Sequence, residues 1–342
     1  MNQETIGHRT IRNTPVKVTE LGFGAAALGN LYRVTSPQDA QAAVEAAWAA
    51  GIRYFDTAPH YGLGLSERRL GAALRDRPRD EYVVSSKAGR LLVPNEHPRG
   101  VDDEGFVVRD DLRRQWDFSR DGVLRSLDET LSRTGLDRLD VVYLHDPDDH
   151  ERQAFDEAMP ALAELRDQGV VGAIGVGMNQ SAMLARFLRE SAADVVMLAG
   201  RYTLLDQSAL DDVLPAAREH GKSVVAVGVF NSGLLSGDRP AEGMKYDYRD
   251  APPELVARAR AIAEVCEAHG TSLPAAAIAF AYTHPAVVNV TLGMRSAAQV
   301  TRNVELHRRH IPAGLWQDLR AEGLIREDVP TDGLRTRSTH CP

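Results

Sequence analysis

The sequence lacks the features that mark secreted, membrane-bound or metal-binding proteins. Its 342 residues include only two cysteines, Cys266 and Cys341, too few for a disulfide framework or a cysteine zinc site, so we expect no metal. No apolar run reaches the ~18 residues of a membrane span, and residues 1–18 have no signal-peptide core. These absences favour a cytoplasmic protein that does not contact a membrane.

A strongly basic segment is also missing. The chain has 40 Lys and Arg against 48 Asp and Glu, mixed along its length, and the formal net charge is −8. Because nucleic-acid binding requires clustered cations that neutralise phosphates, we expect no nucleic-acid partner. The sequence gives no indication of a protein partner.

A third absence concerns nucleotide binding. A GxGxxG fingerprint is absent, and Gly22-Phe23-Gly24 leads into Ala25-Ala26-Ala27 without the helix start that the motif requires. This argues against a Rossmann domain.

Apolar runs of strand length alternate with longer stretches that have apolar residues at helical spacing, a pattern typical of βα units around a parallel sheet. The expected strands, about eight in number, are 20–28, 54–56, 82–86, 140–144, 172–177, 195–198, 223–228 and 287–292. The expected helices are 37–50, 66–75, 120–133, 155–168, 181–190, 210–220, 254–269, 274–283, 297–307 and 313–324. We therefore predict an α/β fold, a (β/α)8 TIM barrel that forms a single domain over residues 1–342.

Several segments lie outside this repeat. Residues 10–18 are expected to form a hairpin that closes the bottom of the barrel, helices near the C-terminus are additions to it, and the polar tail 330–342 is expected to be disordered. The polar segment between Lys87 and Arg120 is too long for a simple connector, which predicts a functional loop beside the pocket, as does 232–253.

Four polar residues fall at or just beyond the carboxyl ends of three successive strands: Asp56, Tyr61, Lys87 and His145. In a barrel these ends meet at one mouth, so the four side chains should converge there. Reduction of a carbonyl by hydride requires a proton donor beside the oxygen, and Tyr61 is suited to that role. A neighbouring ammonium, Lys87, would lower the pKa of the phenol, and Asp56 would keep that lysine charged. His145 would orient the substrate oxygen or share the proton transfer.

The run from Asp56 through Tyr61 to Gly62, followed by Ser66-Glu67, Lys87 and Leu144-His145, resembles the aldo-keto reductase superfamily. The resemblance covers nearly the whole chain. It implies that Tyr61 is the acid/base, that Lys87 and Asp56 tune it, and that His145 orients the carbonyl.

The same resemblance implies a nicotinamide cofactor. The residues that it matches to cofactor contacts are Gly24, Asn179, Phe230, Ser232, Gly233, Leu234, Gly293, Arg295, Gln299 and Asn303. NADP-specific members commonly have cations where Gly293 and Gln299 align, which favours NAD over NADP here, although Arg295 could still reach a 2′-phosphate.

Within the superfamily, His60-Tyr61, the run from Arg201 to Leu205 and the run from Asn231 to Leu235 look most like sugar dehydrogenases of the D-threo-aldose (L-fucose) group, with pyridoxal 4-dehydrogenases similar. Both resemblances imply oxidation of a cyclic hemiacetal to a lactone. The predicted substrate contacts are His60, Trp116 and Arg201.

Other functions stay open on the sequence. One is a general aldehyde or ketone reductase. A second is an aldolase that forms a Schiff base on Lys87, and a third is a regulatory subunit that binds cofactor without turning over substrate.

Overall fold

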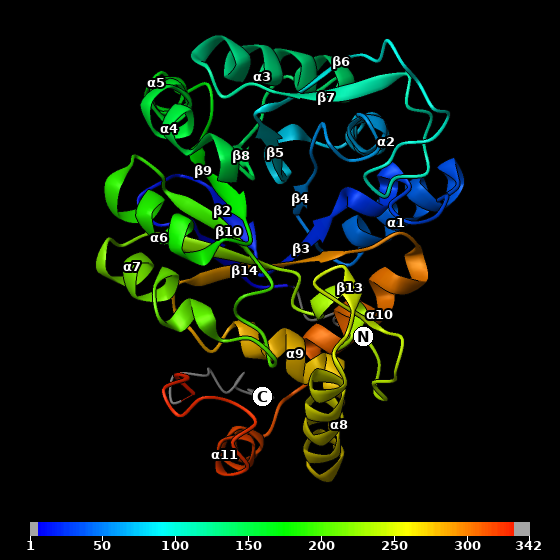
Figure 1. Ribbon diagram of the computed structural model, residues 1–342, viewed down its shortest axis with the longest axis vertical. Coiled ribbons are helices and arrows are strands. Elements are labelled where there is room, and N and C mark those ends of the chain that lie inside the picture. Colours follow the sequence, from blue (N-terminus) through cyan, green and yellow to red (C-terminus); the bar gives the residue numbers. More distant parts are fainter. Residues whose placement is uncertain (1–5, 332–342) are drawn as a thin grey trace.

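A computed structural model that describes residues 6–331 contains eight parallel strands closed into a barrel, with helices packed around it (Figure 1). The barrel strands are β3 (Leu21–Gly24), β4 (Tyr54–Asp56), β5 (Val83–Ala88), β8 (Val141–His145), β9 (Ala173–Met178), β10 (Val195–Ala199), β11 (Ser223–Val227) and β14 (Val287–Gly293). Their order around the barrel is β10-β11-β14-β3-β4-β5-β8-β9. All eight were expected from the sequence, and the (β/α)8 prediction is confirmed.

The helices also follow the predicted periodicity. They are α1 (Pro37–Ala49), α2 (Leu65–Leu74), α3 (Arg120–Thr134), α4 (Glu151–Gln153), α5 (Met159–Asp167), α6 (Ser181–Glu190), α7 (Val213–Glu219), α8 (Pro253–Ala268), α9 (Leu273–Ala281), α10 (Ala297–Arg308) and α11 (Ala313–Ala321). In α3, for example, the Ser119 hydroxyl accepts from the Gly122 amide at the start, and Gly135 ends the helix with φ +67°. One difference is a π-helical turn, Ala154–Ala158, that precedes α5 within the predicted helix 155–168.

A short hairpin closes the amino-terminal end of the barrel, as predicted. Its strands are β1 (His8–Thr10) and β2 (Lys17–Thr19), paired antiparallel. Ile11 and Val18 from this hairpin are fully buried against Tyr54, Tyr143 and other residues inside the barrel. The hairpin therefore fills the interior of the barrel at its amino-terminal end.

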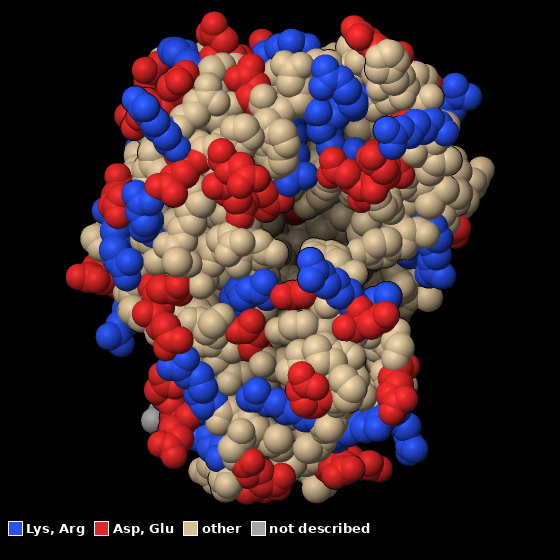
Figure 2. All heavy atoms as spheres, viewed as in Figure 1, with Lys and Arg blue, Asp and Glu red and all other residues tan. Residues whose placement is uncertain are grey.

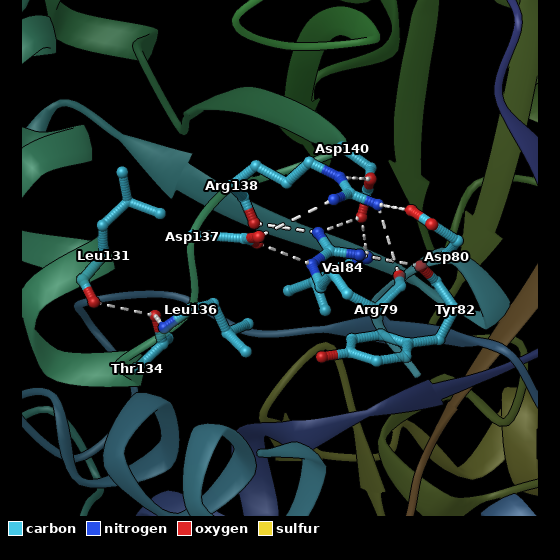
Figure 3. A network of polar contacts seen from close by, with 10 residues as sticks. All are labelled: Arg79, Asp80, Tyr82, Val84, Leu131, Thr134, Leu136, Asp137, Arg138 and Asp140. Carbon is cyan, nitrogen blue, oxygen red and sulfur yellow. Dashed lines mark hydrogen bonds and ion pairs between the residues drawn. The ribbon is translucent and has the colours of Figure 1, made fainter. Parts of the chain in front are cut away.

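Charged residues also fix the amino ends of β5 and β8 (Figure 3). Arg79 Nη2 lies 2.7 Å from Asp140 Oδ2, which also accepts from the Val84 amide at 2.8 Å. Arg138 pairs with Asp80 at 2.6 Å. This network lies at the opposite ends of the strands from Lys87 and His145, so we assign it to the stability of the barrel.

The segment between Lys87 and Arg120 differs from the irregular loop expected from its polar sequence. It contains β6 (Arg90–Pro94) and β7 (Leu112–Trp116), which pair antiparallel with Arg90 opposite Trp116. Polar side chains occupy both faces of β7, Arg113 and Gln115 on one and Arg114 on the other, so the segment lacks the apolar–polar alternation that marks a strand. The second predicted loop also carries a small hairpin, β12 (Lys245–Tyr246) and β13 (Arg249–Asp250).

The remaining sequence expectations concern single features. Cys266 is buried in α8 and unbonded, whereas Cys341 and residues 332–342 of the predicted disordered tail lie outside the described residues. Within residues 6–331, no helix has both the length and the apolar content to cross a bilayer.

Candidate active site

The structure brings the four predicted residues together at the carboxyl ends of the barrel strands. Asp56 is the last residue of β4, Lys87 lies near the end of β5, His145 ends β8, and Tyr61 lies in the turn that precedes α2. Figure 2 shows a hollow in the middle of the viewed face, with acidic and basic side chains on its rim, and Figure 1 places the β12–β13 hairpin beside it.

Lys87 and Asp56 form an ion pair in the floor of this site. Lys87 Nζ lies 2.7 Å from Asp56 Oδ2 and 3.0 Å from the Thr57 carbonyl oxygen, and the side chains are only 2% and 5% exposed. Asp56 Oδ1 accepts from the Ser85 hydroxyl at 2.7 Å. Burial alone would lower the pKa of Lys87, but attraction and hydrogen bonds from Asp56 and Tyr61 raise it above its usual value. The lysine is therefore an ammonium at neutral pH.

Tyr61 lies above this pair, with Lys87 Nζ 4.7 Å from the centroid of its ring. Desolvation raises the pKa of the phenol, and the Lys87 charge opposes that shift without reversing it. From the sequence we expected Lys87 to lower the pKa of Tyr61 overall, and that expectation is wrong. The difference arises because removing water from a phenolate raises its free energy by more than one nearby ammonium lowers it. The phenol is therefore protonated near neutral pH.

His145 is held as a neutral imidazole. Burial lowers its pKa well below the usual value, and Arg90 and Lys87 add to that shift. Its Nε2 lies 3.6 Å from Asp146 Oδ2, whereas its buried Nδ1 has no hydrogen-bond partner within residues 6–331. A neutral ring with hydrogen on Nε2 can donate to a substrate oxygen without carrying charge.

The site also contains charged residues that the sequence analysis did not single out. Arg90 and Asp146 form an ion pair beside His145, and Arg114 pairs with Asp102 while donating to the His60 carbonyl oxygen at 2.9 Å. Arg90 and Arg114 share one face of the β6–β7 hairpin, but no apolar–polar alternation in the sequence marked that hairpin. Asp146 follows His145 directly, so proximity in sequence could have indicated it.

The predicted substrate contacts lie in different surroundings. His60 is close to the tetrad, with its ring centroid 5.4 Å from that of His145, and burial followed by repulsion from Arg90 lowers its pKa to about 2. Trp116 packs against the Arg90 guanidinium, with its ring centroid 4.2 Å from Arg90 Cζ. Arg201 pairs with Asp247 of the β12–β13 turn at 2.9 Å, which places its cation at the rim.

The residues matched to cofactor contacts lie around the same mouth. Gly24 and Gly293 are hydrogen-bonded neighbours at the ends of β3 and β14, and Asn179 follows the end of β9. Residues 231–233, beyond the end of β11, all have positive φ, and this turn exposes their backbone groups. The Ser232 hydroxyl oxygen accepts a hydrogen bond from the Tyr248 amide at 3.0 Å. Phe230 and Leu234 flank that turn, while Gln299 and Asn303 lie on α10.

This arrangement fits a dinucleotide. A Cβ added at Gly293 would meet nothing within 4 Å, so open space borders the backbone there. The surrounding donors are amide groups, hydroxyls, backbone N–H groups and the Arg295 guanidinium, and such donors can bind the ribose and the carboxamide. Among residues 6–331, no group of three His, Cys, Asp or Glu side chains is positioned to hold a metal ion.

Comparison with known proteins agrees with this picture. A model of the aldo/keto reductase family matches residues 20–321. The chain is 51% identical over 312 residues to a D-threo-aldose 1-dehydrogenase from Pseudomonas, covering 90% of this chain and 95% of the relative. It is 39% identical to a pyridoxal 4-dehydrogenase from Microbacterium luteolum, covering 93% and 97%. A solved aldo-keto reductase from Bacillus halodurans in its holo form is 25% identical and superposes with a TM-score of 0.72, covering 95% and 98%.

Proposed function

The chain belongs to the aldo/keto reductase family of oxidoreductases, and on that premise we propose that it oxidises the C1 hemiacetal hydroxyl of an aldose such as L-fucose to the lactone, with NAD as the acceptor. The observation that carries the proposal is the buried Lys87–Asp56 pair directly beneath Tyr61 and beside His145.

In this proposal each residue has one chemical task. His145 donates from Nε2 to the substrate oxygen and so fixes it near the Tyr61 hydroxyl. Tyr61, as phenolate, takes the proton of the C1 hydroxyl, and the ammonium of Lys87 stabilises that negative charge. Asp56 holds the ammonium in place. In the reverse direction the protonated phenol returns the proton to the carbonyl oxygen.

A bound nicotinamide would supply the acceptor for the hydride that leaves C1. The nicotinamide ring and the pyrophosphate would be held by Gly24, Asn179, Phe230 and the turn Ser232–Gly233–Leu234. The adenosine would be held by four residues from the end of β14 to α10. These are Gly293 of β14, Arg295 in the loop that follows it, and Gln299 and Asn303 of α10.

NAD is the preferred form in this proposal. Gly293 and Gln299 carry no charge, and the Arg295 guanidinium donates to the Leu31 carbonyl oxygen at 2.8 Å and to Thr35 Oγ1 at 3.1 Å. Because these bonds already commit the guanidinium, it is a weak partner for a 2′-phosphate. We expect kcat/KM to be about tenfold higher with NAD than with NADP, a difference of about 1.4 kcal/mol.

An absorbance assay of reduced nicotinamide tests the proposal. The purified protein is mixed with NAD or NADP and with L-fucose, D-arabinose, L-galactose or pyridoxal. Growth of the reduced-cofactor band with NAD and an aldose is the expected result. Growth with pyridoxal alone would favour the alternative suggested by the 39% identical relative, and activity only as reduction of simple aldehydes would favour a general reductase.

The structure gives no support to the remaining alternative that uses Lys87 as a nucleophile. A Schiff base requires a neutral amine, whereas Asp56 and Tyr61 raise the pKa of Lys87.

Tyr61 also predicts a pH dependence. Because its pKa is raised above the ordinary value of about 10, the phenolate fraction grows about tenfold per pH unit through the neutral range. We expect kcat/KM for oxidation to rise from pH 6 to about pH 10 without a plateau, while the rate of the reverse reduction stays nearly flat. Initial rates measured across this range would contradict the assignment if oxidation levelled off near pH 7.

A further inference from the structure

An ion pair outside the predicted tetrad lies against its histidine. Asp146 Oδ2 is 3.6 Å from His145 Nε2, the atom that faces the substrate oxygen in the proposed function. The same oxygen accepts from Arg90 Nη2. The carboxylate therefore lies beside the nitrogen that would hold the reacting oxygen, although it takes no part in the proton transfer described above.

The backbone aims Asp146 into the site. This residue has φ +44°, a left-handed conformation that few side chains other than Asn and Asp adopt. Its amide donates to the Gly177 carbonyl oxygen at 3.0 Å, which holds the turn after β8 against β9. The Asp146 side chain is 36% exposed, whereas its partner Arg90 is only 9% exposed. The carboxylate thus has free acceptor positions on the open side of the pair.

Arg90 is fixed from several directions. Its guanidinium packs on the Trp116 ring at 4.2 Å, and its Nη1 lies 3.2 Å from His60 Nδ1 and 3.7 Å from Glu104 Oε2. Because a guanidinium only donates, His60 Nδ1 accepts this bond, and the ring hydrogen of the neutral His60 lies on Nε2. Trp116 in turn packs against Phe118, with ring centroids 6.0 Å apart. The predicted substrate contact Trp116 therefore acts by holding Arg90.

We propose that Asp146, positioned by Arg90, binds the C2 hydroxyl of the aldose, next to the reacting C1, and so selects polyhydroxylated substrates. This inference rests on the proposed aldose oxidation. A carboxylate oxygen accepts from a hydroxyl in a charge-assisted hydrogen bond, which is about twice as strong as a neutral one. A substrate without that hydroxyl would leave the acceptor positions on the open side of the Asp146–Arg90 pair without this hydrogen bond, and that loss gives selectivity.

The site offers an isosteric variant for the test. Asp146→Asn keeps the shape and tolerates the left-handed backbone, so it should fold as the parent does. Asp149→Asn removes the same charge from an exposed position three residues away and is the matched control. Arg90→Lys keeps a cation but loses the planar fork that reaches both His60 and Asp146.

The experiment measures kcat and KM with NAD for L-fucose and for 2-deoxy-L-fucose. In the parent protein, loss of the C2 hydroxyl should lower kcat/KM about ten- to a hundredfold. In Asp146→Asn the KM for L-fucose should rise by a similar factor, while kcat stays within about threefold of the parent value. The kcat/KM values of the two sugars should then differ little in this variant, because the substitution in the enzyme and the change in the substrate remove the same contact. Arg90→Lys should give an intermediate KM, and Asp149→Asn should match the parent.

The outcomes separate this inference from the one that it rests on. If the parent oxidises no aldose, the proposed function and the inference both fail. If the parent oxidises L-fucose but the deoxy penalty is the same in Asp146→Asn, only the role of Asp146 is overturned. A fall in kcat by equal factors for both sugars would also overturn it, since that result would assign Asp146 to the alignment of His145.

Discussion

Replacement of Tyr61 by Phe should lower kcat for aldose oxidation about a thousandfold or more, within the range expected for loss of a general acid/base. The change removes one oxygen and keeps the ring that packs near His145 and Phe106. Stability should therefore change by no more than about 1 kcal/mol, and NAD should bind as before. Steady-state rates, thermal unfolding and a cofactor titration give the three values.

Tyr54→Phe is the matched control. Its hydroxyl is also buried in the barrel, 3.1 Å from the Tyr143 hydroxyl, in the cluster that packs on Ile11 and Val18 of the amino-terminal hairpin. Its removal leaves the Tyr143 hydroxyl without that partner, so we expect a loss of about 1–3 kcal/mol of stability and a kcat within a few-fold of the parent. Equal losses of activity in the two variants would mean that Tyr61 has no special role.

Much of this fold could be predicted because the barrel strands carry a simple signal. A parallel strand covered on both faces is an unbroken apolar run, as in β10 with Val195 to Leu198, and the helices between such runs have their own period. The tetrad was predictable for the same reason. Asp56, Lys87 and His145 each lie at the end of such a run, and the closed topology brings those ends together.

The rest of the site depends on contacts that a local pattern does not encode. Arg90 and Arg114 are polar residues in a strand pair, and their burial comes from Asp146 and Asp102, which lie 56 and 12 residues away in the chain. The pKa of Tyr61 likewise depends on the balance between desolvation and the charge of Lys87. The burial of the arginines and the pKa of Tyr61 are both set by three-dimensional packing. A local sequence pattern therefore does not predict them.

Lys87→Met should give the other large effect, with losses in both activity and stability. The variant removes the ammonium that stabilises the Tyr61 phenolate, and we expect kcat to fall about a hundred- to a thousandfold. It also leaves Asp56 as a buried carboxylate without its cation. Breaking a buried pair in this way costs about 3–5 kcal/mol, which denaturant unfolding would measure.

A double variant separates the two effects. Asp56→Asn with Lys87→Met removes both charges, so no uncompensated carboxylate remains, and the Ser85 hydroxyl can still donate to the amide oxygen. We expect most of the lost stability to return while kcat stays low, because the phenolate still has no ammonium beside it. Recovery of activity together with stability would show that Lys87 serves only to neutralise Asp56, and the role of Lys87 in the proton transfer would have to be abandoned.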